Sequence, residues 1–143
     1  ARIRDWWGGT LILKGIMDPE DAKQAGKIGA DAIVVSNHGG RQLDGAESSI
    51  AMLPEVVAAV GNEIDVWMDS GVRSGQDVLK AIALGAKGVM IGRAFIYALG
   101  ANGKQGVSDA LHIIHKELDY TMAMCGHRDI HNVDRQILRN CPF

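Results

Sequence analysis

The chain has 143 residues, of which 47% are hydrophobic and 22% are charged, and its formal net charge at pH 7 is −2. This composition excludes a disordered chain and predicts a single domain over residues 1–143. The small net charge offers no basic patch for nucleic acid, and no apolar run reaches the length of a membrane-spanning helix.

The chain opens at Ala1 and lacks both a starting methionine and the apolar core of a signal peptide. From this abrupt opening we expect a fragment, a processed chain or an incompletely traced one. Cys125 and Cys141 do not have the spacing of a metal or redox pair. We therefore expect two reduced thiols, as in a cytoplasmic protein.

Four short apolar runs predict strands that are covered on both faces, as parallel strands are. These runs lie at residues 11–13, 32–35, 65–68 and 88–91. The segments between them carry helix signals, so strands and helices alternate along the chain.

Capping residues mark the helices. Asp18 is placed as an N-cap, with Pro19 in the first helical position and Asp21 as a capping-box-like carboxylate. Gly29 and Gly85 are placed to end two helices as left-handed C-caps.

Two further helices are expected at about residues 50–60 and 107–125, each followed by a glycine. Apolar residues recur at helical spacing in the second of them. We expect this stripe to face the core, and its members are Leu111, Ile114, Leu118, Met122 and Cys125.

An internal repeat organises the whole chain. A shift of 56 residues places Gly15 on Gly71 and aligns two βαβ units, residues 11–66 and 67–122. Four strand–helix units of the α/β class amount to half of a (β/α)8 TIM barrel, and we interpret them as strands five to eight, the C-terminal half. A small doubly wound, flavodoxin-like sheet accommodates the same elements.

The most informative segment is Ser-Asn-His-Gly-Gly-Arg-Gln-Leu-Asp at residues 36–44, directly after the second predicted strand. Parallel sheets keep their active sites at the carboxyl ends of strands. Histidine is the residue type best suited to act as a base near neutral pH, which makes His38 a candidate base. Arg41 offers a rigid fork for a carboxylate.

Anion-binding residues follow the last two strands. Gly92 and Arg93 open a helix, where free backbone N–H groups and the helix dipole favour a phosphate. Arg73 can add a charged hydrogen bond and Asp69 can accept bonds from a polyol; alternatively, these two form a structural ion pair at a turn. Neither a GxGxxG fingerprint nor a P-loop is present, which disfavours NAD and ATP.

Four motifs together resemble the FMN-dependent 2-hydroxy-acid dehydrogenases and oxidases, a family that includes L-lactate dehydrogenases, mandelate dehydrogenases and glycolate oxidases. They are Leu-Lys-Gly at 13–15, Ser-Asn-His-Gly-Gly-Arg-Gln at 36–42, Asp-Ser-Gly-Val-Arg at 69–73 and Ile-Gly-Arg at 91–93. The bacterial lactate and mandelate enzymes are the most similar branch. The resemblance implies FMN-dependent oxidation of a small, lactate-like L-2-hydroxy acid to the 2-oxo acid, with electrons passed to a quinone, a cytochrome or O2.

The resemblance also implies roles for single residues. Lys14 would stabilise the reduced flavin, His38 would take a proton from the substrate, and Arg41 would bind the substrate carboxylate. The residues implied for FMN binding are Lys14, Ser36, His38, Gly39, Arg41, Asp69, Gly71, Arg73, Gly92 and Arg93. The remaining histidines lack an acidic partner at ligand spacing, so we expect no metal site.

In this family the first half of the barrel supplies part of the flavin site, substrate-binding tyrosines and an aspartate that orients the catalytic histidine. We therefore expect a missing N-terminal half-barrel as the partner of this chain, a homotetramer, and a location in the cytoplasm or on the inner face of the cytoplasmic membrane. Two alternatives stay open: a half-barrel that binds FMN or another phosphate ester without catalysis, and a barrel of the isopentenyl-diphosphate isomerase or IMP dehydrogenase type.

Overall fold

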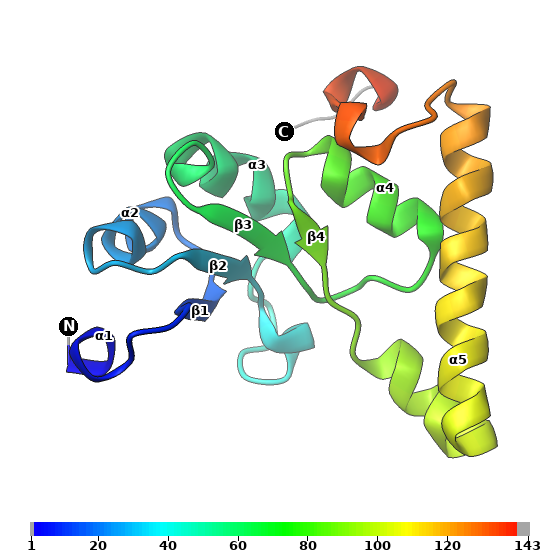
Figure 1. The fold of residues 1–143 in the computed structure, drawn as a ribbon, viewed down its shortest axis with the longest axis horizontal. Coiled ribbons are helices and arrows are strands. Elements are labelled where there is room, and N and C mark those ends of the chain that lie inside the picture. Colours follow the sequence, from blue (N-terminus) through cyan, green and yellow to red (C-terminus); the bar gives the residue numbers. More distant parts are fainter. Residues whose placement is uncertain (1, 140–143) are drawn as a thin grey trace.

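Strands and helices alternate along the computed structural model, which describes residues 2–139 (Figure 1). The strands are β1 (Ile12–Ile16), β2 (Ala32–Val35), β3 (Asp65–Met68) and β4 (Gly88–Val89). The α-helices are α1 (Arg2–Trp6), α2 (Pro19–Lys27), α3 (Ser49–Val60), α4 (Gly75–Ala83) and α5 (Arg93–Met124). Three single-turn 3-10 helices are at His38–Gly40, Ile130–Asn132 and Arg135–Ile137.

The four strands form one parallel sheet in the order β1-β2-β3-β4. Each strand therefore pairs with the next one in the sequence, and α2, α3 and α4 follow one another along the same side of the sheet (Figure 1). A flavodoxin-like sheet would instead have the order 2-1-3-4-5. The prediction of part of a (β/α)8 barrel is confirmed, and the doubly wound alternative is wrong.

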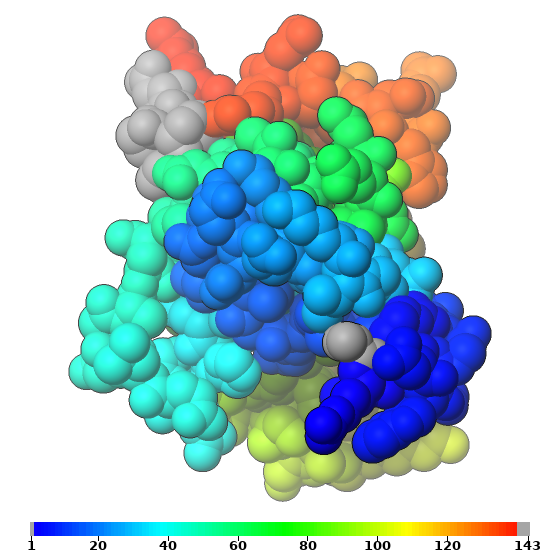
Figure 2. Space-filling model, turned by 90° about the vertical axis from the view of Figure 1, so that its left-hand side faces the viewer, coloured from blue at the N-terminus to red at the C-terminus, as the bar shows by residue number. Residues whose placement is uncertain are grey.

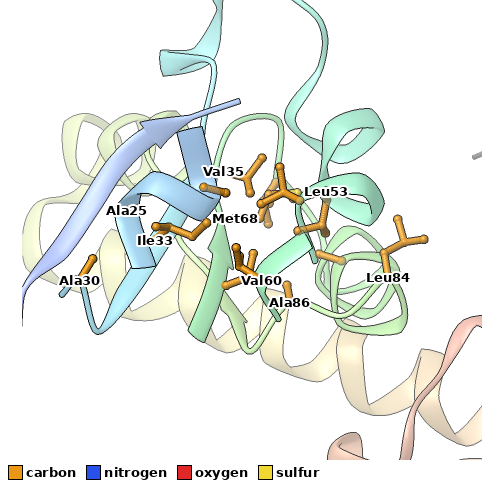
Figure 3. Close-up of a cluster of buried hydrophobic side chains, with 14 residues drawn as sticks. Ala25, Ala30, Ile33, Val35, Leu53, Val60, Met68, Leu84 and Ala86 are labelled. Atoms are coloured by element: carbon orange, nitrogen blue, oxygen red, sulfur yellow. The ribbon is translucent and has the colours of Figure 1, made fainter. Parts of the chain in front are cut away.

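The core lies between the sheet and these helices. Ile33 and Val35 of β2 are completely buried against Leu53 and Val60 of α3 (Figure 3). Met68 from β3 joins the same cluster. Burying an aliphatic side chain of this size contributes about 1.5–3 kcal/mol, so this cluster holds the strand ends in place.

The opposite face of the sheet is partly exposed, although Val34 near its centre is only 3% exposed. Lys14, Val34, Trp67 and Gly88 are lateral neighbours in the strand register and share this face. Trp67 is 36% exposed there, and Ile12, two residues before Lys14 on the same face, is 52% exposed. In a closed barrel this face would be the packed interior.

The N-terminal segment is attached through one arginine. The guanidinium of Arg4 donates to the carbonyl of Gly29 at 2.9 Å and forms an ion pair with Asp31 at 2.9 Å. Asp31 also accepts a hydrogen bond from the backbone N–H of Leu11. These contacts keep the segment, a dark-blue lobe in Figure 2, beside the end of α2.

The predicted caps are present at α2 and α4. Asp18 accepts from the backbone of the first turn of α2, as expected, whereas the reciprocal capping box forms at α4, between Ser74 and Asp77. Gly29 and Gly85 adopt the predicted left-handed conformation, with φ of 83° and 103°.

Several predicted boundaries are corrected. β1 begins at Ile12 and continues to Ile16, and β4 ends at Val89, two residues earlier than expected. The last predicted helix is the second part of α5, which begins at Arg93 and kinks at Asn102.

The predicted core stripe of the last helix is only partly correct. Met122 is buried and Leu118 is half-buried, but Leu111 is 52% exposed and Cys125 is exposed. The reason is that α5 meets α4 near Leu118, so the preceding turns extend beyond the packed surface. Cys125 is a free thiol, and Cys141 lies outside the described residues. No helix within residues 2–139 is both long and apolar enough to cross a membrane.

The contact between α4 and α5 depends on a glycine. A Cβ atom at Gly75 would lie 2.0 Å from the backbone N of Leu118. The backbone N–H of Gly75 donates to Glu117 at 2.9 Å, which fixes the same contact.

We expect Gly75→Ala to lower the free energy of unfolding by about 3 kcal/mol, because neither backbone can move aside without losing the core contact. Gly100→Ala is the matched control in α5, since a Cβ there meets nothing within 4 Å. The control should change stability by less than about 1 kcal/mol. Urea denaturation of both variants measures the difference, and equal midpoints would contradict this packing.

Candidate active site at the strand ends

The carboxyl ends of all four strands surround one pocket of about 990 Å³. Nine of the ten residues predicted to bind FMN line this pocket: Lys14, His38, Gly39, Arg41, Asp69, Gly71, Arg73, Gly92 and Arg93. The tenth, Ser36, is 1% exposed and lies behind Lys14, whose Nζ donates to its Oγ at 2.9 Å. The fold thus brings together residues that are up to 79 positions apart, from Lys14 to Arg93.

An ion pair lies at the centre of the pocket. Lys14 Nζ is 2.7 Å from Asp69 Oδ2, and the Asp69 side chain is only 17% exposed. The alternative ion pair between Asp69 and Arg73 is wrong, because the structure pairs Asp69 with Lys14. The register of β1 against β2 shifts between Lys14 and Ile16, a bulge of the kind that re-aims side chains near active sites.

Two serines connect this ion pair to the segment that carries His38. Ser36 Oγ accepts the backbone N–H of His38 at 3.2 Å. Ser70 Oγ donates to Asp69 at 2.8 Å and accepts the backbone N–H of Gly39 at 3.0 Å. The backbone of the His38 segment is therefore anchored to the charged pair.

The His38 side chain lies against the bulge in β1. A Cβ atom at Gly15 would come within 2.7 Å of His38 Cε1, and Gly15 has a φ of 93°. His38 itself has a positive φ of 57°, which is uncommon outside glycine and typical of functional segments. Within residues 2–139 the imidazole has no hydrogen-bond partner, and His38 lines the pocket without a carboxylate to orient its ring.

The pocket wall is strongly cationic. Lys14, Arg41, Arg73 and Arg93 line it, against the single carboxylate of Asp69. This excess of positive charge favours an anionic ligand. Arg93 also donates to the carbonyl of Gly39 at 3.2 Å and so contacts the His38 segment from the other side of the pocket.

The N-terminus of α5 opens into the same pocket. Gly92 is its N-cap, and no side chain caps the free N–H groups of the first turn. A Cβ at Gly92 would meet nothing within 4 Å, so there is room for a ligand atom beside the backbone. The dipole and the uncapped N–H groups make this end of α5 suited to a phosphate.

Two residues of the site escaped the sequence analysis. The sequence places Gly15 in the internal repeat and in the Leu-Lys-Gly motif without a role of its own, although a glycine inside a strand is a signal of close backbone approach. Ser70 was read only as part of a motif, and its positive φ of 75° has no signature in the sequence. Among residues 2–139, no three metal-ligating side chains gather at one place.

The charge state of Asp69 follows from its surroundings. Burial raises the pKa of Asp69, but hydrogen bonds from Lys14, Ser36 and Ser70, together with the charge of Lys14, outweigh burial and hold this pKa below the usual aspartate value of 3.8. The lowered pKa of Asp69 stabilises the folded protein. This stabilisation is present above the ordinary aspartate pKa and is lost as the pH falls through the lowered pKa of Asp69.

We expect Lys14→Met to raise the pKa of Asp69. The substitution removes one hydrogen bond and one positive charge that lower this pKa, while burial continues to raise it. The acid-induced loss of stability should shift to higher pH in the same variant. Carboxyl-carbon NMR titration measures the pKa directly. Lys23→Met removes an exposed ion pair with Glu20 and serves as the control that leaves Asp69 unchanged. An unaltered Asp69 titration in Lys14→Met would refute the coupling.

Comparisons with known proteins agree with this geometry. The family model described as FMN-dependent dehydrogenase matches residues 1–140. An L-lactate dehydrogenase of Caulobacter sp. (strain K31) is 59% identical over 136 residues, which are 95% of this chain and 36% of that protein. An L-lactate dehydrogenase of Pseudomonas syringae pv. syringae (strain B728a) is 52% identical over the same shares.

Solved structures give the same relationship. A mandelate oxidase variant with a monooxide FMN adduct superposes with a TM-score of 0.90 at 46% identity, covering 94% of this chain and 43% of that one. Mandelate oxidase with benzoyl-formic acid superposes with a TM-score of 0.89 at 47% identity, covering 93% and 40%. The chain thus spans little more than a third of the curated relatives that it matches. On the family match over nearly its whole length, the chain belongs to the FMN-dependent dehydrogenase family.

Proposed function

We propose that this chain forms the FMN phosphate site and the proton-transfer site of an enzyme that oxidises a small, lactate-like L-2-hydroxy acid to the 2-oxo acid. One observation carries the proposal: the imidazole of His38, the guanidinium of Arg41, the ammonium group of Lys14 and an uncapped helix N-terminus line a single pocket. The names of the relatives, L-lactate dehydrogenase and mandelate oxidase, support this substrate class.

The chemistry of the pocket fits FMN. The uncapped end of α5 at Gly92, with Arg73 and Arg93 beside it, suits a phosphate monoester. Val72, Met90 and Ile91 add an apolar wall suited to part of a flat aromatic ring. When bound, FMN supplies the two-electron acceptor that none of the side chains provides.

Three side chains of this chain have separate roles in the proposed reaction. Arg41 binds the carboxylate of the hydroxy acid through its forked guanidinium and so orients the substrate. His38 accepts a proton from the substrate at a ring nitrogen, as a general base. Lys14 holds a positive charge within β1, just before the bulge, where it stabilises negative charge that develops during oxidation.

The exposed apolar residues on the inner face of the sheet support the proposal that a further part of the barrel packs against it. Ile12, Trp67 and Met90 expose apolar surface where a barrel would be packed, and the matched residues make up only 36% of the Caulobacter L-lactate dehydrogenase. The proposal is that an N-terminal half-barrel covers this face and supplies the carboxylate that orients His38 and the substrate-binding tyrosines. By family resemblance it extends to a homotetramer in the cytoplasm or on the inner face of the cytoplasmic membrane, with a quinone, a cytochrome or O2 as electron acceptor.

A half-barrel that binds FMN or another phosphate ester without catalysis is the second candidate. It is favoured by two observations. The cationic residues suited to a phosphate line the pocket, whereas the His38 ring has no partner within residues 2–139 to orient it as a base. The two candidates differ in whether a 2-hydroxy acid reduces the bound flavin.

We expect His38→Gln, made in the full polypeptide that contains these residues, to slow anaerobic flavin reduction by L-lactate by about 10²–10⁴-fold, because a general base contributes that much. Bound FMN should be retained. Stopped-flow loss of oxidised-flavin absorbance measures the rate. His112→Gln, on an exposed part of α5, is the control. Reduction of the His38 variant at the wild-type rate would rule out this role.

We expect Arg73→Gln to weaken FMN binding by about 10–100-fold while leaving riboflavin binding unchanged, because only the phosphate loses a charge-assisted hydrogen bond. Arg128→Gln, outside the pocket, should bind both ligands normally. Quenching of flavin fluorescence on titration into the apoprotein measures both affinities. If riboflavin lost affinity to the same extent as FMN, Arg73 would not bind the phosphate.

A further inference from the structure

Ser70 has a conformation that serine rarely adopts. Its φ is 75°, and apart from glycines only His38 shares a positive φ among the described residues. A side chain in this left-handed region is unfavourable, and glycine would occupy the position without strain. The following residue, Gly71, is also left-handed, with a φ of 85°, so the chain turns sharply at the end of β3.

The strained conformation gives the Ser70 hydroxyl two partners. It donates to Asp69 Oδ1 at 2.8 Å and accepts the backbone N–H of Gly39 at 3.0 Å. Glycine at this position would keep the turn but lose both hydrogen bonds. The cost of the conformation is therefore offset by contacts that only the hydroxyl provides.

The bond to Gly39 differs from the other contacts of the His38 segment. Asn37 Oδ1 accepts the same N–H at 2.9 Å, but it belongs to the segment and shapes it locally. Among the described residues, Ser70 gives the one hydrogen bond that joins the segment after β3 to residues 37–48. It therefore fixes where the His38 segment lies relative to β3 and to the Lys14–Asp69 pair.

We propose that Ser70 is a positioning residue for His38, which anchors the backbone next to the imidazole to the Lys14–Asp69 pair. The inference rests on the proposed function, because it assumes that His38 takes the proton from the substrate. A serine anchor explains why the fold retains a strained side chain where the turn alone would favour glycine.

Ser70→Gly in the full polypeptide, loaded with FMN, separates positioning from a merely structural role. We expect flavin reduction by L-lactate to slow about tenfold, the effect of one lost hydrogen bond on an activation barrier. The melting temperature should stay within about 2 °C of wild type, since relief of strain offsets the lost bond. Ser70→Asn tolerates the left-handed conformation and keeps a side-chain oxygen that can accept the Gly39 N–H, so it should reduce at a rate within about threefold of wild type.

A second readout does not depend on turnover. In the FMN-free protein, hydrogen exchange at the Gly39 amide should be about tenfold faster in Ser70→Gly than in wild type, because one of its two acceptors is gone. Ser108→Ala, on the exposed part of α5, is the serine control for both measurements and should change neither.

The outcomes distinguish the two proposals. Slow reduction with fast Gly39 exchange in Ser70→Gly, and recovery of both in Ser70→Asn, support the positioning role. Wild-type reduction by Ser70→Gly, or unchanged Gly39 exchange, overturns it and leaves the proposed function intact. A wild-type flavin that L-lactate does not reduce overturns the proposed function and the positioning role with it.

Discussion

The ion pair between Lys14 and Asp69 is the contact on which the site depends. It joins the middle of β1 to the end of β3 across β2 at 2.7 Å, and Ser36 and Ser70 extend it to the backbone of His38 and Gly39. Because the Asp69 carboxylate is largely buried, it is kept charged by these donors rather than by water. The same ammonium group that secures the carboxylate is available to a bound anion, so structural and chemical roles coincide in one residue.

The sequence was sufficient to predict the class of fold and most of the site, because both depend on local signals. Apolar runs and capping residues located the strands and helices, and the rule that parallel strands keep reactive groups at their carboxyl ends brought Lys14, His38 and Arg93 together. What the sequence could not predict depends on contacts between distant segments. The close approach of Gly15 to His38 and the bond from Ser70 to Gly39 exist only once three strands are paired. The exposure of Leu111 likewise depends on where α5 leaves α4.

The two faces of the sheet differ in a way that is expected for part of a larger barrel. Its helix-covered face is packed around Ile33 and Leu53, whereas the opposite face leaves Ile12 and Trp67 partly in water. Relatives of which this chain spans 36% would have ample length to cover that face. The His38 ring has no partner within residues 2–139. It lies on the side of the sheet that the rest of a barrel would cover.

The most direct test of the account is a crystal structure of the full polypeptide that contains these residues, with FMN and a 2-oxo acid bound. The account predicts the FMN phosphate at the N-terminus of α5 beside Gly92 and Arg93, the ring edge at Lys14, and the oxo-acid carboxylate on Arg41 next to His38. FMN bound away from the ends of these four strands, or a phosphate held by residues other than those after β3 and β4, would contradict it.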